Sequence, residues 1–252
     1  MIYFDANTWI GSWPFSFQPT HTARSLEGAL RPHRIGRALV SSLACVFAPD
    51  PAPGNRALLA STRGFAGLQP VPIVNPMLGN WREEVERVLK DPRVRSIRIL
   101  PAYHGYRLRQ AAVGDLLELL EERGRRLIVS ARLIDERHEY HALTIKPVAT
   151  ADLDAFLGKY RRVPVLVSGL LRPDIVTLAK AHAQLLADLS FAEWHETMRY
   201  LTAHVSARQL VFASHTPFLI TAAAPAKFDG ANLPKRVLQP IASGNLESFL
   251  DE

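Results

Sequence analysis

Residues Asp5–Gly11 read DANTWIG and follow the apolar run Ile2–Phe4. In a β-strand, side chains two residues apart point to the same side, so Asp5, Asn7 and Trp9 share one face. The stretch therefore predicts a first strand near the N-terminus whose polar and aromatic side chains look into one pocket.

Short β-branched apolar runs alternate with helical patterns along the whole chain. We expect eight strands, over Ile2–Asp5, Arg37–Ser42, Val71–Asn75, Val94–Leu100, Leu127–Arg132, Val163–Ser168, Leu185–Leu189 and Gln209–Ser214. Helices are expected between them, over Ser25–Pro32, Asn55–Arg63, Trp81–Leu89, Val113–Arg123, Ala151–Tyr160, Pro173–Ala181 and Glu193–Val205. Such alternation implies parallel strands with right-handed crossovers, and eight units favour a closed barrel over an open sheet. The predicted fold is α/β, a single distorted (β/α)8 barrel, with residues 1–252 as one domain.

The C-terminal segment departs from this alternation. Ala222–Pro234 contains several Ala, Gly and Pro residues and is expected to form a long loop over the pocket. A helical segment over Lys235–Ala242 and a final helix beginning near Asn245 are expected to follow.

Composition narrows the function classes. The formal net charge of the 252-residue chain is +6, but its Arg residues are scattered and form no basic tract of the kind that binds nucleic acid. The single cysteine, Cys45, allows no intramolecular disulfide and fits a reducing compartment. No signal-peptide pattern and no run of about 18 apolar residues is seen. We expect a cytoplasmic protein with a small, anionic partner molecule; homo-oligomerisation stays open.

Four segments together resemble the amidohydrolase superfamily, in particular its amidohydrolase-related group of predicted metal-dependent hydrolases. They are the opening Phe4–Gly11, the tripeptide Ile99–Pro101, the segment FASHTP at Phe212–Pro217, and the closing Ile241–Leu250 with its Gly244-Asn245 pair. The resemblance covers nearly the whole chain in order. It implies a distorted (β/α)8 barrel whose active site lies at the C-terminal ends of the strands.

The resemblance also implies where a metal would be held. The family draws ligands from strands 1, 5, 6 and 8, and these positions fall on Asn7, Trp9, Ser130, Ser168 and His215. Only His215 is a good transition-metal ligand, because Asn and Ser bind such ions poorly and an indole does not bind them. We therefore expect no metal and no cofactor. A relocated site that uses His104, His138, His141 or His215 remains an alternative.

Asp5 and His215 are the first catalytic candidates, because strands 1 and 8 are neighbours in a closed barrel. An aspartate beside an imidazole could fix its tautomer and raise its pKa to about 6.5 or above, giving a base that activates water. The alternative is structural, with Asp5 holding loop backbone and His215 bonded to a neighbour. His104, in the loop after strand 4, is the third catalytic candidate, as a group that polarises a carbonyl.

Substrate-binding candidates come from the same end of the predicted barrel. Arg132 and Arg137 follow strand 5 and could hold a carboxylate through a bidentate fork. The remaining candidates are Asn7, Trp9, Tyr103, Asp135 and His141. Salt bridges on a solvated loop would explain the charged residues equally well. Ser42 and Cys45 are expected to be structural, and Ser190 with Glu193 predicts a helix capping box.

The leading hypothesis is an amidohydrolase-like hydrolase that cleaves a small carboxylate-bearing ester, lactone or amide without the family's metal site. The alternatives are a non-catalytic barrel that serves as a binding or scaffold protein, and a non-oxidative decarboxylase. A catalytic site should bring Asp5, His104, Arg132 and His215 around one open pocket. A non-catalytic barrel should have that space filled by Trp9 and nearby apolar groups.

Overall fold

The computed structural model describes residues 1–15, 18–135, 137 and 140–251. Eight parallel strands form two sheets, with the orders β1-β2-β3 and β4-β5-β6-β7-β8. The strands are β1 (Tyr3–Ile10), β2 (Ile35–Ser42), β3 (Leu68–Pro70), β4 (Ser96–Ile99), β5 (Arg126–Ser130), β6 (Val165–Ser168), β7 (Leu185–Asp188) and β8 (Leu210–Val211). Parallel β-branched runs of this kind are buried on both faces.

Backbone hydrogen bonds join the two sheets at both seams. Between β3 and β4, the amide of Arg98 donates to Pro72 at 2.9 Å, and the amide of Val74 donates to Arg98 at 3.0 Å. Between β8 and β1, the amide of Ala6 donates to Phe212 at 3.0 Å. The strands therefore surround a common interior, and the predicted distorted (β/α)8 barrel is confirmed.

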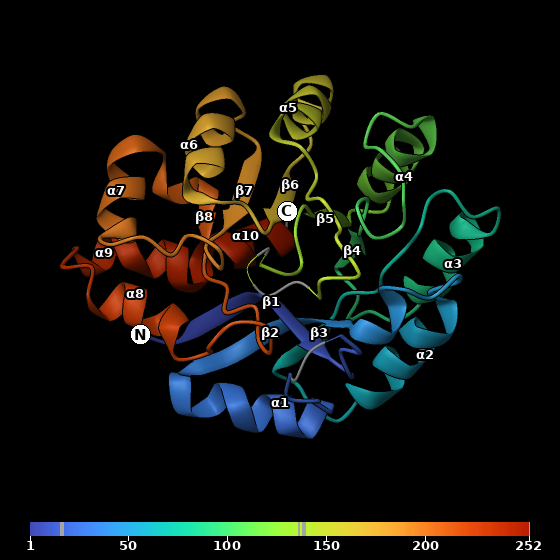
Figure 1. Cartoon of the computed structure of the whole chain (residues 1–252), viewed down its shortest axis with the longest axis horizontal. Coiled ribbons are helices and arrows are strands. Elements are labelled where there is room, and N and C mark those ends of the chain that lie inside the picture. Colours follow the sequence, from blue (N-terminus) through green and yellow to red (C-terminus); the bar gives the residue numbers. More distant parts are fainter. Residues whose placement is uncertain (16–17, 136, 138–139, 252) are drawn as a thin grey trace.

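Helices surround the strands on the outside (Figure 1). They are α1 (Ala23–Leu30), α2 (Ala52–Ser61), α3 (Trp81–Val88), α4 (Ala111–Glu122), α5 (Thr150–Lys159), α6 (Arg172–Ala181), α7 (Thr197–His204), α8 (Ala223–Asp229), α9 (Lys235–Gln239) and α10 (Asn245–Asp251), with short turns at Arg31–His33, Leu43–Cys45 and Ala207–Gln209. In α4, Leu116, Leu117 and Leu120 are buried against the strands, as its amphipathic spacing predicts. Within the described residues, no helix has the length and apolar character needed to cross a membrane.

The C-terminal helix closes the end of the barrel where the strands begin. Leu246, Phe249 and Leu250 of α10 pack against inward-facing residues of the strands. Arg126, at the start of β5, donates to the carbonyl of Phe249 at 2.8 Å, and Arg95 donates to that of Leu250 at 3.0 Å. Two guanidinium groups thus satisfy the last carbonyls of α10, where cations are favoured.

A π-helical turn, η5 (Pro240–Gly244), joins α9 to α10 and makes the helical stretch continuous, where the sequence predicted two separate segments. The Ile241 carbonyl accepts the amide of Phe212 at 2.9 Å. The Asn245 side chain donates to Ala207 at 2.7 Å and to Leu210 at 2.8 Å. The closing segment that carried the family resemblance therefore anchors the C-terminus to β8.

Several predicted elements were wrong in position or type. The third strand covers Leu68–Pro70 and lies wholly before the predicted Val71–Asn75, and Pro72 has no N–H to continue the ladder beyond it. The loop predicted over Ala222–Pro234 contains α8, since its alanines are good helix formers and Pro225 lies in the first turn, where proline is tolerated. The predicted capping box at Ser190 was also wrong, because α7 begins only at Thr197.

Candidate functional site

Polar side chains gather inside the barrel at the C-terminal ends of the strands. They are Asn7 of β1, Arg98 of β4, Ser130 of β5, Ser168 of β6, Asp188 of β7 and His215 in the loop after β8. Each is at most 2% exposed. These side chains are therefore packed in the barrel interior, out of contact with bulk solvent.

Asn7 is the centre of this group. Its side-chain oxygen accepts from Arg98 at 2.8 Å and from the indole of Trp9 at 3.0 Å. Its side-chain nitrogen lies 2.9 Å from Asp188 Oδ2 and 2.8 Å from His215 Nδ1. All the hydrogen-bonding capacity expected of an amide in the interior is used.

The two ring nitrogens of His215 have different partners. Nδ1 faces the Asn7 amide, which donates, and Nε2 lies 2.6 Å from the carbonyl of Leu133, which accepts. The ring is thus neutral with its proton on Nε2. Burial lowers the pKa of His215 to about 3, so the expectation of a value at or above 6.5 was wrong.

Asp5 holds backbone rather than the imidazole. Its Oδ1 accepts the amides of Asn7 and Ser214, each at 3.0 Å. Its Oδ2 is buried without a hydrogen-bond partner among the described residues. Burial raises the pKa of Asp5 to about 7. The contact geometry matches the structural alternative for this pair, because His215 is oriented by Asn7 and Leu133.

Arg98 was missed by the sequence reasoning. Its guanidinium donates to Asn7 at 2.8 Å and to Ser130 Oγ at 3.1 Å, and it lies 4.6 Å from the centre of the Trp9 ring. Burial lowers its pKa to about 10, which leaves it charged at neutral pH. The strand pattern contained a signal, because Ile97 and Ile99 pack outward against the helices and the residue between them must point inward.

The donor set does not fit the family's metal centre. Both nitrogens of His215 are engaged, Ser130 and Ser168 bond to each other at 3.0 Å, and Trp9 offers only a donor. A guanidinium at the same place would repel a divalent cation. In the described part of the chain, no group of three or more His, Cys, Asp or Glu residues could hold a metal ion.

Nor do the described histidines of the proposed relocated site converge. His104 Nε2 lies 3.2 Å from the carbonyl of Cys45, and burial lowers the pKa of its ring. His141 is exposed beside Tyr140. His138 lies outside the described residues.

An apolar layer covers the polar interior. Trp9, Leu100, Leu133 and Phe218 belong to one buried cluster. The Phe218 ring packs 5.1 Å from the His215 ring, and the Trp9 ring lies 6.4 Å from it. Tyr103 joins the rim of this layer, with its ring 6.4 Å from that of Trp13. The layer separates the network from solvent, because Trp9 and nearby apolar groups fill the space above it.

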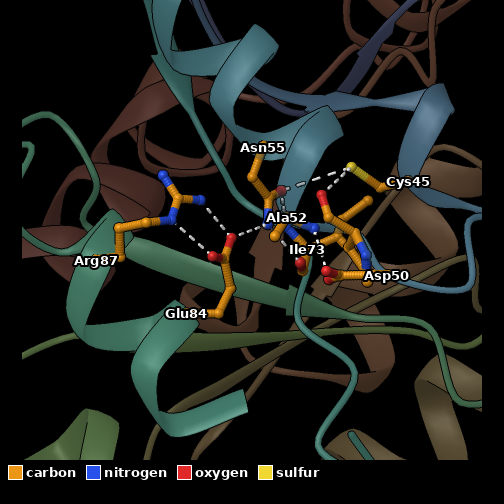
Figure 2. A network of polar contacts seen from close by, with 8 residues as sticks. Cys45, Asp50, Ala52, Asn55, Ile73, Glu84 and Arg87 are labelled. Atoms are coloured by element: carbon orange, nitrogen blue, oxygen red, sulfur yellow. Dashed lines mark hydrogen bonds and ion pairs between the residues drawn. The ribbon is translucent and has the colours of Figure 1, made fainter. Parts of the chain in front are cut away.

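Cys45 belongs to a second network of polar contacts (Figure 2). Its thiol, which has one proton, lies 3.5 Å from the Pro51 carbonyl and 3.6 Å from Asn55 Oδ1, and Asn55 Nδ2 donates to Glu84 at 2.8 Å. Arg87 then binds Glu84 through two bonds of 2.8 and 2.6 Å. Burial raises the pKa of Cys45 to about 12, which suppresses the reactive thiolate. The contacts connect the loop after β2 to α2 and α3 and fit a structural role.

An open cleft lies to one side of the barrel centre. A cleft of about 430 Å³ is formed by the loops that follow β5, β6 and β7. It is lined by Arg132, Asp135, Arg137, Leu171, Phe191, Glu193, Trp194 and His195. The sequence predicted Arg132, Asp135 and Arg137 as binding residues, and the structure brings these three together. It adds aromatic walls that the sequence reasoning missed.

Within the cleft, the Phe191 ring contacts both the Arg132 guanidinium, at 5.6 Å, and the His215 ring, at 5.2 Å. Arg137 is engaged by Asp135 through bonds of 2.9 and 2.5 Å, so its fork is already occupied. Gly169 has φ +82°, and a Cβ there would lie 2.5 Å from the Arg132 carbonyl. Only glycine lets the β6 loop approach Arg132 this closely.

Solved structures resemble this chain over nearly its full length. The 5-carboxyvanillate decarboxylase from Sphingomonas paucimobilis has a TM-score of 0.77 at 12% identity, covering 99% of this chain and 98% of its own. A dihydroxybenzoic acid decarboxylase from a Polaromonas species, solved with bound manganese, has a TM-score of 0.76 at 12% identity, with coverages of 99% and 96%.

A protein described as a probable 2-pyrone-4,6-dicarboxylic acid hydrolase from Acinetobacter baumannii has a TM-score of 0.67 at 12% identity and covers 100% of both chains. No family model matches the sequence, and no curated protein matches it. At these identities the likeness concerns the fold, which decarboxylases and hydrolases share. The resemblance inferred from the sequence motifs is confirmed at that level: the chain has the fold of the amidohydrolase-superfamily barrels.

Proposed function

We propose that this chain is a non-catalytic barrel that binds a small carboxylate-bearing molecule in the cleft beside the barrel axis. The observation that carries the proposal is the contrast between two neighbouring places. The groups that would do chemistry at the barrel centre have no accessible surface, whereas the cleft beside them is open. A ligand entering from solvent meets Arg132, Phe191 and Trp194 before it meets His215.

The cleft has the mixed lining expected of a small-molecule site. Phe191 and Trp194 provide flat apolar surface, and Trp194 is 70% exposed. The Arg132 guanidinium, which lies over the Phe191 ring, has the planar geometry that suits a carboxylate. A ligand with a carboxylate next to a flat apolar part matches these groups. Gly169 packs against the backbone of Arg132 and so helps to fix its position in the cleft.

The hydrolase hypothesis receives less support from the geometry. A general base needs an available lone pair within reach of water. His215 uses Nδ1 to accept from Asn7, and its pKa is far below neutrality. Asp5 is fully buried against backbone amides. Both candidates would need the apolar layer to open before they could act.

Isothermal titration with benzoate, 3-phenylpropionate and the neutral amide benzamide tests the proposal. We expect the two carboxylates to bind and benzamide to bind more weakly. Arg132→Ala should weaken carboxylate binding ~10-fold or more, because a charge-assisted hydrogen bond is lost. Trp194→Leu, on an exposed rim, should weaken binding with little effect on folding. Arg162→Ala, exposed before β6 at the opposite strand ends, is the matched control.

Two results would contradict the proposal. Equal carboxylate binding by Arg132→Ala and Arg162→Ala would remove the cleft as the binding site. Turnover of an ester, lactone or amide, or release of CO₂ from a carboxylate, would restore the hydrolase or decarboxylase hypothesis. A turnover screen with purified wild-type protein therefore accompanies the titrations.

A further inference from the structure

Five positions are those at which the family resemblance implies metal ligands: Asn7, Trp9, Ser130, Ser168 and His215. In this structure they surround one side chain, Arg98. Three of them contact the Arg98 guanidinium directly, Asn7 at 2.8 Å, Ser130 at 3.1 Å and the Trp9 ring at 4.6 Å.

The other two positions are each one hydrogen bond further away. His215 bonds to Asn7, and Ser168 bonds to Ser130. Each of the five positions therefore either contacts the Arg98 guanidinium or is bonded to a residue that does. The positions come from β1, β5, β6 and the loop after β8, while Arg98 comes from β4.

We propose that the Arg98 guanidinium takes the place of the metal ion that the family resemblance implies. Its contacts hold the C-terminal strand ends together. The inference goes beyond the proposed function, because it holds whether or not a ligand binds in the cleft.

The charges around Arg98 support this role. The ionisable groups that face it are Asp188, which it reaches through the Asn7 amide, Asp5 on the same strand as Asn7, and neutral His215. Asp188 also accepts the hydroxyl of Ser190 at 2.8 Å and the amide of Gly169 at 3.3 Å. A buried carboxylate is stable only with a nearby cation or several donors. Asp188 has these donors and two nearby cations, Arg98 and Lys227, and Arg98 places its charge at the barrel centre without an ion from solution.

Chemical rescue tests the proposal. Arg98→Ala leaves a guanidinium-sized space and should lower the melting temperature by ~10 °C, because several buried hydrogen bonds and a buried charge near Asp188 are removed. Methylguanidinium at 10 mM should recover a large part of this loss. Methylurea, which has a similar shape without charge, should recover little. Equal recovery by both compounds, or none by either, contradicts the role of the charge.

Double substitution provides a second readout. Arg98→Met keeps most of the side-chain volume but removes a cation near Asp188. The double variant Arg98→Met/Asp188→Asn should therefore melt at a higher temperature than Arg98→Met alone. A double variant that is less stable than the sum of the single losses predicts would overturn the coupling.

Restoring ligands tests the replacement of the metal itself. Asn7→His/Trp9→His with Arg98→Ala places three imidazoles where Arg98 was, and should bind about one Mn²⁺ per chain in a titration followed by electron paramagnetic resonance. Asn7→His/Trp9→His with Arg98 retained should bind at least ~10-fold more weakly, because the guanidinium repels the ion. Equal binding with and without Arg98, or no binding by either folded variant, contradicts the proposal.

Discussion

The side-chain amide of Asn7 lies 2.8 Å from His215 Nδ1 and fixes His215 as the neutral tautomer that carries its proton on Nε2. Because an amide nitrogen only donates, Nδ1 must accept, and its lone pair is used. The histidine that resembles a catalytic residue in sequence is therefore a connector between Asn7 and the Leu133 carbonyl. The same amide also donates to Asp188.

Asn7→Asp should strongly destabilise the protein at pH 8. The substitution replaces two donated hydrogen bonds with a carboxylate that faces Asp188 across 2.9 Å, and like charges at this distance in the interior are costly. We expect the free energy of unfolding to fall by ~3 kcal/mol or more, from the cost of an unpaired buried charge. Urea denaturation measures the change.

Asn75→Asp is the matched control for this substitution. Asn75 uses its side-chain oxygen to accept the amide of Met77, a bond that an aspartate can also make. Its effect should stay within ~0.5 kcal/mol, as for surface substitutions. If Asn7→Asp were equally mild, Asn7 could not be the centre of the network.

Asp5 predicts a specific pH dependence of stability. Its pKa is raised by burial from 3.8 to about 7, so the folded state favours the protonated form. The contribution of Asp5 to stability is complete below pH 3.8 and is lost as pH rises towards 7, at up to ~1.4 kcal/mol per pH unit. Asp5→Asn should therefore gain stability relative to the wild type between pH 4 and 7, with no further change above.

Equilibrium unfolding in urea at intervals between pH 4 and 8 measures this difference. Comparing the variant with the wild type is necessary, because Asp188 also has a raised pKa and contributes in the same direction. A difference that stays constant over this range would show that Asp5 does not titrate as its burial implies.

Much of the architecture could be predicted from the sequence. The alternation of strands and helices gave eight strands in the right order, and the closing motif around Asn245 fell where it anchors the C-terminus. The ends of strands and helices were less predictable where hydrogen bonds to distant parts of the chain determine them. Phe212, for example, leaves β8 because its amide bonds to Ile241 in the π turn.

The candidate site was harder to predict for a physical reason. Comparison with a family motif identifies positions, so Asn7, Ser130 and His215 were found. It does not identify a new residue that fills the space between them, and Arg98 comes from a strand that contributes none of those positions. The sequence of the long segment after β5 also does not reveal that Asp135 accepts two hydrogen bonds from the Arg137 guanidinium.

His215→Gln should change the acid sensitivity of the protein in the direction opposite to Asp5→Asn. Burial lowers the pKa of His215 from 6.5 to about 3, so its contribution to stability is complete above pH 6.5 and is lost as pH falls towards 3. The difference in the free energy of unfolding between the wild type and the variant should therefore shrink as pH falls from 6.5 to 4. Exposed His204, replaced by Gln, is the control for the loss of one histidine side chain. A parallel pH profile for His215→Gln and the wild type would mean that His215 is not held neutral.

Gly54→Ala should destabilise the network around Cys45, because a Cβ at position 54 would lie 2.5 Å from the Cys45 Sγ. Neither atom can easily move, since the thiol is held by Pro51 and Asn55. Overpacking of this kind typically costs ~1–3 kcal/mol. Thermal unfolding should show the loss, and Cys45→Ala should relieve it when combined with Gly54→Ala. Gly64→Ala, whose Cβ would meet nothing within 4 Å, is the control and should be neutral or slightly stabilising. If Gly54→Ala behaved like Gly64→Ala, the close packing of Cys45 against α2 would be wrong.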